Sequence, residues 1–221
     1  MVSVDGVTKR FGTLTALEDI TVALEAGKTY GLFGENGAGK TTLVKVLSGT
    51  LSPDAGSVRV LGTDPAKQWR IRRRMGIVED GDAYFPELTA REHLWWVGRL
   101  RGLDDARCEE QMDTLLHTFR VRDRADDLIC SLSHGMRRKV CVASAFIGRP
   151  DIILLDEPTT GLDVDSLDSL GNLLASHRGR GGVALLASHN RAFLGGVCSE
   201  VIFLSKGRMT GLGSVEDLCD R

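Results

Sequence analysis

The segment GENGAGKT, residues 34–41, restricts the fold of this chain more than any other feature of its sequence. It follows the compact apolar stretch TYGLF, which favours a buried strand, and runs into KTTLVKVLSG, where Leu43, Val46 and Leu47 have helical spacing. A strand, a glycine-rich loop and a helix in this order form the phosphate-binding motif G-x-x-x-x-G-K-[ST]. The glycines let backbone N–H groups curl around phosphates without interference from Cβ atoms. The sequence therefore predicts a nucleoside triphosphate site in an α/β fold.

Two side chains of this loop have distinct expected roles. Lys40 is expected to reach the β- and γ-phosphates, and Thr41 to hold Mg²⁺ through its hydroxyl. The positive N-terminal end of the following helix adds to the attraction for phosphate. The residues expected to contact the nucleotide in this part of the chain are Gly34, Glu35, Asn36, Gly37, Ala38, Gly39, Lys40, Thr41 and Thr42.

Two later segments place polar side chains at the ends of apolar strands. In IILLDEP the strand delivers Asp156 and Glu157, and Pro158 stops it. Parallel sheets bind ligands at the carboxyl ends of their strands. We expect Asp156 to fix Mg²⁺ through its water shell and Glu157 to act as general base on the attacking water. His189 ends the strand VALLASH and is expected to lie near the same γ-phosphate as a third catalytic residue with Lys40.

The order of predicted elements indicates how the chain is divided. MVSVDGV and ITVALEAG alternate as half-buried antiparallel strands do, and SVRV reads as a third. Residues 81–149 are mostly helical, beginning with a capping box between Thr89 and Glu92. After them, two apolar strands separated by a helix are typical of parallel strands joined by crossovers. We expect an ATP-binding core of residues 1–80 and 150–221 with an inserted helical subdomain at 81–149.

The segment SLSHGMRRK, residues 131–139, has the form of a second anion-binding helix start. Ser131 or Ser133 can cap a helix that begins at Gly135. Its first turn carries three cations, which is the unfavourable charge for a helix N-terminus. This pattern predicts an anion or carboxylates nearby, and salt bridges within the fold are the alternative.

Composition excludes several other classes of protein. A net charge of -2 gives no general attraction to nucleic acid or acidic lipid. The apolar runs are too short to cross a bilayer and the first residues lack the apolar stretch of an export signal, so we expect neither a membrane span nor export. The five cysteines contain no Cys-x-x-Cys pair, which argues against a disulfide framework or zinc site and for reduced thiols in cytoplasm.

Together these motifs resemble those of the nucleotide-binding subunit of ATP-binding cassette (ABC) transporters, over essentially the whole chain. Residues 34–42 resemble the Walker A motif, and Ile152–Glu157 the Walker B motif with its catalytic glutamate. The remaining similarities are those of Leu132–Met136 to the LSGGQ signature, Thr160–Asp163 to the D-loop, His189 to the switch histidine and Phe11 to the adenine-stacking aromatic. From its position alone, Phe11 fits a core aromatic nearly as well.

The resemblance implies a P-loop NTPase fold, with a RecA-like parallel sheet core, an N-terminal antiparallel β subdomain and an inserted α-helical subdomain. All of it would form a single nucleotide-binding domain, residues 1–221. In this family two such domains pack head to tail, and each ATP lies between the Walker A of one and the signature of the other. The implied nucleotide contacts from the signature side are Leu132, Ser133, His134, Gly135, Met136 and Asp163.

The implied function is that of an ATPase subunit, with ATP and Mg²⁺ as cofactors, which drives transport through a separate integral membrane permease. A homodimer is implied because both halves of the composite site occur in this chain, and the expected location is the cytoplasmic face of the membrane, as a peripheral subunit. The form of the signature favours export, and no nucleic acid partner is expected. The alternative is a soluble ABC ATPase acting on ribosomes or DNA, although such proteins typically carry two cassettes or a long coiled coil.

Some positions depart from the family pattern. Asp80 stands where the Q-loop glutamine is expected and is assigned to the metal with Thr41 and Asp156, with Glu79 as the alternative if the register differs by one. This change makes a nucleotide-binding regulator with little hydrolysis a further alternative. His134 replaces the first signature glycine, and whether it donates to phosphate is left open; Met136 replaces glutamine.

Two surface features bear on a membrane partner. In REHLWWVGRLRGL the spacing predicts that Trp96, Val97, Leu100 and Leu103 share a buried face, which leaves Trp95 exposed as a candidate contact for a membrane subunit. Packing of Trp95 inside the helical subdomain is the alternative. The run RIRRR, residues 70–74, is expected to be a solvated, salt-bridged face, with binding to acidic lipid headgroups as the other reading.

Overall fold

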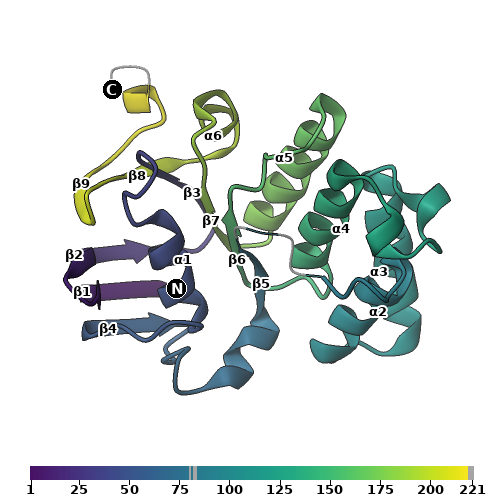
Figure 1. Ribbon diagram of the computed structural model, residues 1–221, viewed down its shortest axis with the longest axis horizontal. Coiled ribbons are helices and arrows are strands. Elements are labelled where there is room, and N and C mark those ends of the chain that lie inside the picture. Colours follow the sequence, from purple (N-terminus) through teal and green to yellow (C-terminus); the bar gives the residue numbers. More distant parts are fainter. Residues whose placement is uncertain (80, 82–83, 219–221) are drawn as a thin grey trace.

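The chain forms two sheets flanked by helices, as shown in the computed structural model, which describes residues 1–79, 81 and 84–218 (Figure 1). The first sheet is three-stranded, in the order β2-β1-β4, and the second is six-stranded, in the order β5-β6-β7-β3-β8-β9. The strands are β1 (Val2–Phe11), β2 (Leu14–Leu24), β3 (Lys28–Phe33), β4 (Ala55–Val60), β5 (Met75–Val78), β6 (Ile152–Asp156), β7 (Val183–Ala187), β8 (Glu200–Ser205) and β9 (Arg208–Gly213). The α-helices are α1 (Lys40–Ser48), α2 (Ala90–Leu100), α3 (Asp105–Thr118), α4 (His134–Phe146), α5 (Val164–Gly179) and α6 (Arg191–Val197). Short 3₁₀ helices are η1 (Trp69–Arg74), η2 (Arg122–Arg124), η3 (Ile129–Ser131) and η4 (Glu216–Leu218).

The six-stranded sheet is parallel from β5 through β8, and only β9 runs antiparallel to its neighbour. β6 and β7 are buried along their whole length, which explains their unbroken apolar sequences. Leu32 of β3 and Asp156 of β6 both pair with Ala187 of β7, which lies between these two strands. The carboxyl ends of β3, β6 and β7 therefore meet.

The three-stranded sheet is antiparallel, as the alternating sequences predict. Val4 on β1 lies opposite Val22 on β2 and Val58 on β4, and all three side chains are buried. They belong to an apolar cluster shared with α1 and with one face of the six-stranded sheet. Side chains of β6 alternate between the two faces of the sheet. Leu154 belongs to this cluster, whereas Ile153 and Leu155 belong to a second apolar cluster on the opposite face.

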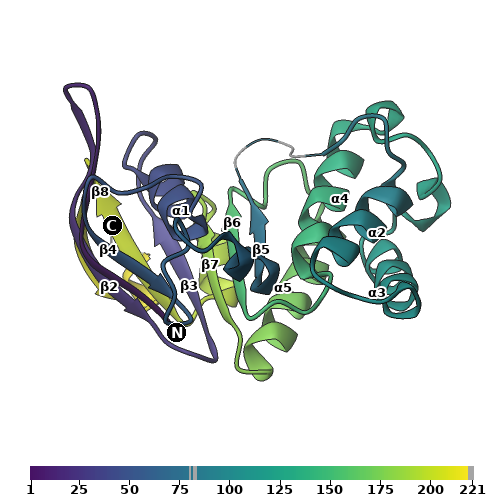
Figure 2. The ribbon, with the colours of Figure 1, turned by 90° about the horizontal axis from the view of Figure 1, so that it is seen from below.

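The second apolar cluster joins the other face of the sheet to the helices. Helices α2, α3 and α4 gather at the end of the molecule away from the antiparallel sheet (Figures 1 and 2). The predicted capping box begins α2, with Thr89 Oγ1 accepting from Glu92 N at 3.1 Å and Glu92 Oε2 accepting from Thr89 N at 2.8 Å. These helices therefore occupy the part of the chain expected to be helical.

The C-terminal end of α4 lies so close to β5 that there is no room for a side chain on the strand at the point of contact. A Cβ on Gly76 of β5 would stand 2.0 Å from the carbonyl oxygen of Ala145, so only glycine permits this approach. The same end of α4 is capped by Arg101, whose Nη1 donates to the carbonyls of Ser144 and Ala145 at 3.0 and 3.2 Å. The C-terminal end of α4 is thus fixed to β5 and α2.

The predicted buried face of α2 is wrong for two of its residues. Trp96 is 39% exposed and Leu100 51% exposed, while the helix buries a stripe of Ala90, Leu94 and Gly98. Gly98 sets this orientation, because a Cβ there would lie 2.8 Å from Cys108 Sγ of α3. The apolar periodicity favoured burial of Trp96 and Leu100, whereas α2 approaches α3 closely at the small residue Gly98.

The helices and cysteines of the described residues can be compared with what composition suggested. Within the described ranges, no helix combines the length and the apolar character that crossing a bilayer requires. Cys108, Cys130 and Cys198 are free thiols.

Candidate functional site

The glycine-rich loop connects β3 to α1 and has the shape that the motif predicts. Lys40 is only 7% exposed, and its Nζ donates to the carbonyl oxygens of Gly34 at 2.7 Å and Glu35 at 3.2 Å. Gly39 has φ 106°, and a Cβ there would stand 2.5 Å from the carbonyl oxygen of Ala16. The loop therefore folds back around the lysine, and glycine is required where it passes β2.

A pocket of about 620 Å³ opens beside this loop, a size within the range of small-molecule sites. Phe11 is 50% exposed and lies in its wall with Leu14, so the core-aromatic reading of Phe11 is wrong. The pocket is thus lined by both an aromatic side chain and Lys40, which fits a base and phosphates. The lining residues are Phe11, Leu14, Thr15, Ala16, Asn36, Gly37, Gly39, Lys40, Thr41, Thr42, Asp156, Glu157 and Lys206.

The residues expected to hold Mg²⁺ can be compared with this pocket. Thr41 and Asp156 both line it, and they supply hydroxyl and carboxylate oxygens, the donors that Mg²⁺ prefers. Asp80, the third expected ligand, lies outside the described residues. Among the described residues, no three His, Cys, Asp or Glu side chains form a group that could hold a metal ion.

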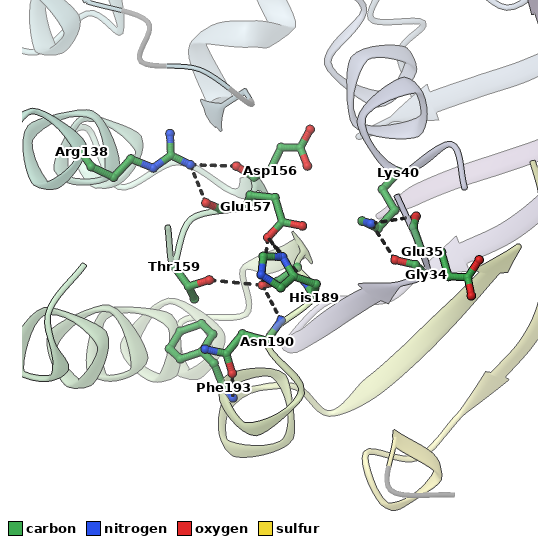
Figure 3. A network of polar contacts seen from close by, with 11 residues as sticks. Gly34, Glu35, Lys40, Arg138, Asp156, Glu157, Thr159, His189, Asn190 and Phe193 are labelled. Carbon is green, nitrogen blue, oxygen red and sulfur yellow. Dashed lines mark hydrogen bonds and ion pairs between the residues drawn. The ribbon is translucent and has the colours of Figure 1, made fainter. Parts of the chain in front are cut away.

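Glu157 is held by a network of hydrogen bonds at the end of β6 (Figure 3). Its Oε2 lies 2.9 Å from Nδ1 of His189 and accepts from Ser188 Oγ at 3.3 Å. Its backbone N–H donates to Ala187 at 2.8 Å, and its φ of 46° turns the chain out of the strand. The expectation that a parallel neighbour brings His189 to this end of the sheet is confirmed.

Sequence reasoning missed Ser188 as the centre of that network. Its Oγ lies 3.3 Å from Thr159 Oγ1 and accepts from Asn190 N at 3.1 Å. Asn190 in turn caps α6 by accepting from Phe193 N at 3.0 Å. The small polar residue between an apolar strand and a histidine was the available signal, but its partners come from distant segments.

The second helix start differs in detail from the prediction. Ser133 is the N-cap of α4 and accepts from Met136 N at 3.3 Å, so the helix begins at His134, one residue before the predicted start. Ser131 instead donates to the carbonyl of Leu128 at 2.7 Å. The capping role therefore belongs to Ser133.

The three cations of this turn have partners inside the fold, and Lys139 forms a salt bridge of the kind that the alternative reading predicted. Arg137 donates to the carbonyl of Leu132 at 2.7 Å, and Arg138 donates to two carbonyls at the end of β6. Lys139 donates to Asp163 Oδ2 at 2.7 Å, and this bond lowers the pKa of Asp163 to about 2. The argument from these charges to a nearby anion is therefore unnecessary.

The expected nucleotide-binding residues thus form two separate groups. Among the described residues the lining of the 620 Å³ pocket includes none of residues 132–136 and does not include Asp163. These residues gather instead around the start of α4, where a Cβ on Gly135 would lie 2.9 Å from the carbonyl oxygen of Gly161. Gly34, Glu35, Asn36 and His189 line an adjoining cavity of about 490 Å³, and Ala38 is buried beneath the loop.

Comparison with known proteins gives one consistent family. Residues 17–160 match the family model described as "ABC transporter". The chain is 36% identical to "Nod factor export ATP-binding protein I" of Ralstonia nicotianae, covering 99% of this chain and 68% of that protein. It is 33% identical to "ABC transporter ATP-binding protein NatA" of Bacillus subtilis, covering 99% of this chain and 91% of that protein. The solved structure titled "Structure of ATP binding subunit of ABC transporter" superimposes with a TM-score of 0.93 at 29% identity, covering 98% of this chain and 91% of the other.

Proposed function

Because the chain belongs to the ABC transporter family of ATP-binding proteins, we propose that it hydrolyses ATP to drive transport through a separate membrane permease. One observation carries the hydrolytic part of the proposal: Glu157, paired with His189, lines the same pocket as Lys40. A carboxylate, a cation and an open pocket between them are the parts that phosphoryl transfer to water requires.

The proposed reaction uses groups already in position around this pocket. Lys40 exchanges the loop carbonyls for phosphate oxygens. Glu157 accepts a proton from the attacking water. The oxygen of that water bonds to the γ-phosphorus while the bond from this phosphorus to the β–γ bridging oxygen breaks. His189 holds the Glu157 carboxylate in place through the 2.9 Å contact. Thr41 and Asp156 are the described residues that would hold Mg²⁺, which neutralises phosphate charge when bound.

We place the second half of each ATP site on another copy of the chain. Ser133 and His134 are exposed at the start of α4, outside the pocket of their own chain. In a head-to-tail dimer this start would close the pocket of the partner, with ATP between the two surfaces. Residues 1–221 then act as one nucleotide-binding domain, in which residues 81–149 form the helical part that carries the start of α4.

Substitution of Ser133 tests this closure without removing the helix cap. Aspartate and asparagine cap helices about as well as serine, but only aspartate adds a negative charge facing the partner's γ-phosphate. In a Glu157→Gln background, gel filtration with ATP should show a dimer for Ser133→Asn and a monomer for Ser133→Asp, because like charges at an interface cost several kcal/mol. ATP binding to the monomer should be unchanged. An equal dimer fraction in both variants would refute the proposed interface.

A groove at the junction of the sheet and the helices is the proposed permease contact. It has a volume of about 420 Å³ and an apolar floor bordered by arginines. The exposed Trp95, which the sequence predicted as a membrane-subunit contact, and Trp96 lie on α2, the helix that contributes Val97 and Leu100 to the groove. The lining residues are Trp69, Arg72, Arg73, Met75, Ile77, Val97, Leu100 and Arg101. The similarity to a protein named for Nod factor export supports export, from a peripheral position on the cytoplasmic face of the membrane.

A charge placed in this groove tests the transport role. In its native cell, Leu100→Glu should move the tagged chain from the membrane fraction to the supernatant, whereas the ATPase activity of the purified variant should be unchanged. Leu128 is a matched control because it is also an exposed leucine, but it lies outside the groove. Leu128→Glu should remain with the membrane. Wild-type chain that sediments with ribosomes or nucleic acid instead of membranes would favour the alternative function.

A further inference from the structure

Arg138 is a buried cation that joins the start of α4 to the end of β6. Its side chain is 3% exposed, and Nη2 donates to the carbonyl oxygen of Asp156 at 2.9 Å and to that of Glu157 at 2.7 Å (Figure 3). The guanidinium therefore holds two successive carbonyls at the residue where the strand ends. Sequence reasoning treated this arginine only as a cation at a helix start.

The conformation of Glu157 gives this contact its importance. A φ of 46° is unusual for a residue with a side chain, and such backbone persists only where the surroundings hold it. Three contacts of its backbone hold it here: the N–H of Glu157 donates to Ala187 of β7, and its carbonyl accepts from Arg138 of α4 and from Thr160 N at 3.3 Å. This backbone turn directs the carboxylate toward His189 rather than along the strand (Figure 3).

The same turn of α4 also holds the far end of the segment that follows Glu157. Lys139 donates to Asp163, the N-cap of α5, at 2.7 Å. Between these ends, Gly135 approaches the carbonyl of Gly161 so closely that a Cβ would stand 2.9 Å from it. Residues 156–163 are thus contacted by the first two turns of α4 at both ends and in the middle.

We propose that Arg138 is a positioning residue for ATP hydrolysis: it sets the backbone of Glu157 according to the position of the α4 start. The inference rests on the proposed function, in which Ser133 meets the nucleotide held by the partner subunit. Through Arg138, closure on that nucleotide orients the base that serves this chain's own pocket. The two ATP sites of the dimer are thereby coupled through the two hydrogen bonds that the Arg138 side chain donates to backbone carbonyls.

The test compares two arginines of the same helical turn. Arg138→Gln replaces the guanidinium by a shorter amide that no longer reaches both carbonyls, whereas Arg137→Gln removes only a bond to Leu132 within the helix start. For Arg138→Gln, kcat should fall about 10²-fold with an unchanged KM for ATP, the scale expected when a catalytic group is misplaced by about 1 Å. Arg137→Gln should keep the wild-type kcat. Arg138→Lys should recover part of the loss, because an ammonium group can still donate to these carbonyls.

A second readout separates positioning from a general structural role. In a Glu157→Gln background, Arg138→Gln should still form the ATP-dependent dimer by gel filtration, because the α4 start and the glycine-rich loop remain intact. Loss of that dimer together with activity, or a wild-type kcat in Arg138→Gln, would overturn the proposal. If Arg138→Gln does not fold, Arg138→Lys decides, and an unchanged kcat in that variant overturns it. A wild-type chain that hydrolyses no ATP would instead refute the proposed function.

Discussion

Glu157→Gln should reduce kcat for ATP hydrolysis by about 10²- to 10⁴-fold, the usual contribution of a positioned general base. Glutamine has the size of glutamate and can still form hydrogen bonds with Ser188 and His189, so the local structure should persist. It cannot accept the proton of the attacking water. Phosphate release from ATP by the purified chain measures the loss, and gel filtration with ATP should show a stable dimer because the nucleotide is bound but not cleaved.

Glu35 provides a matched control for this substitution. It is a carboxylate of the same loop region, but it contributes only its backbone carbonyl to Lys40 and does not line the 620 Å³ pocket. Glu35→Gln should therefore keep the wild-type rate. Retention of full activity in Glu157→Gln would exclude Glu157 as the base and leave its pairing with His189 a structural feature.

Lys40→Ala should abolish tight nucleotide binding and, with it, hydrolysis. Its ammonium group is held by the carbonyls of the loop itself, a position that Lys206, the other lysine lining the pocket, does not share. Charge-assisted hydrogen bonds contribute about 1.5–3 kcal/mol, so losing two of them with phosphate should weaken ATP binding by about 10²-fold or more. Isothermal titration calorimetry with ATP measures this change directly.

Lys45 is the control for this prediction. It lies on the same helix in its last turn and does not line the pocket. Lys45→Ala should keep the wild-type affinity for ATP. Unchanged affinity together with unchanged hydrolysis in Lys40→Ala would show that the nucleotide is bound elsewhere, whereas unchanged affinity without hydrolysis would limit the lysine to the transition state.

The sequence was most informative where residue type dictates local backbone. Gly39 and Lys40 could be placed because a loop between a strand and a helix with this spacing has few possible shapes, and the structure contains that shape. Asp156 and Glu157 could be placed beside His189 because parallel strands end at one edge. In each case a short segment and one topological rule were sufficient.

Contacts between distant segments were the part that could not be predicted. Arg138 was interpreted through the helix dipole, but its long side chain reaches past the helix to carbonyls 18 and 19 residues away. The buried face of α2 was misjudged because periodicity weighs large residues, whereas Gly98 allowed the closest packing. The partners of Ser188 likewise depend on how three segments meet, which no local pattern records.

The missing side chain at Gly76 limits how α4 can move. Because the backbone of Ala145 already touches the strand at this glycine, the helix cannot slide closer to β5. Any displacement of α4 that keeps the contact between Gly76 and Ala145 must therefore be a rotation of the helix about that contact. Ser133 lies 12 residues away, roughly 18 Å along a helix, so the lever arm is longest at the N-terminal end. A small tilt at the strand would become the largest movement where α4 meets Glu157 and Asp163.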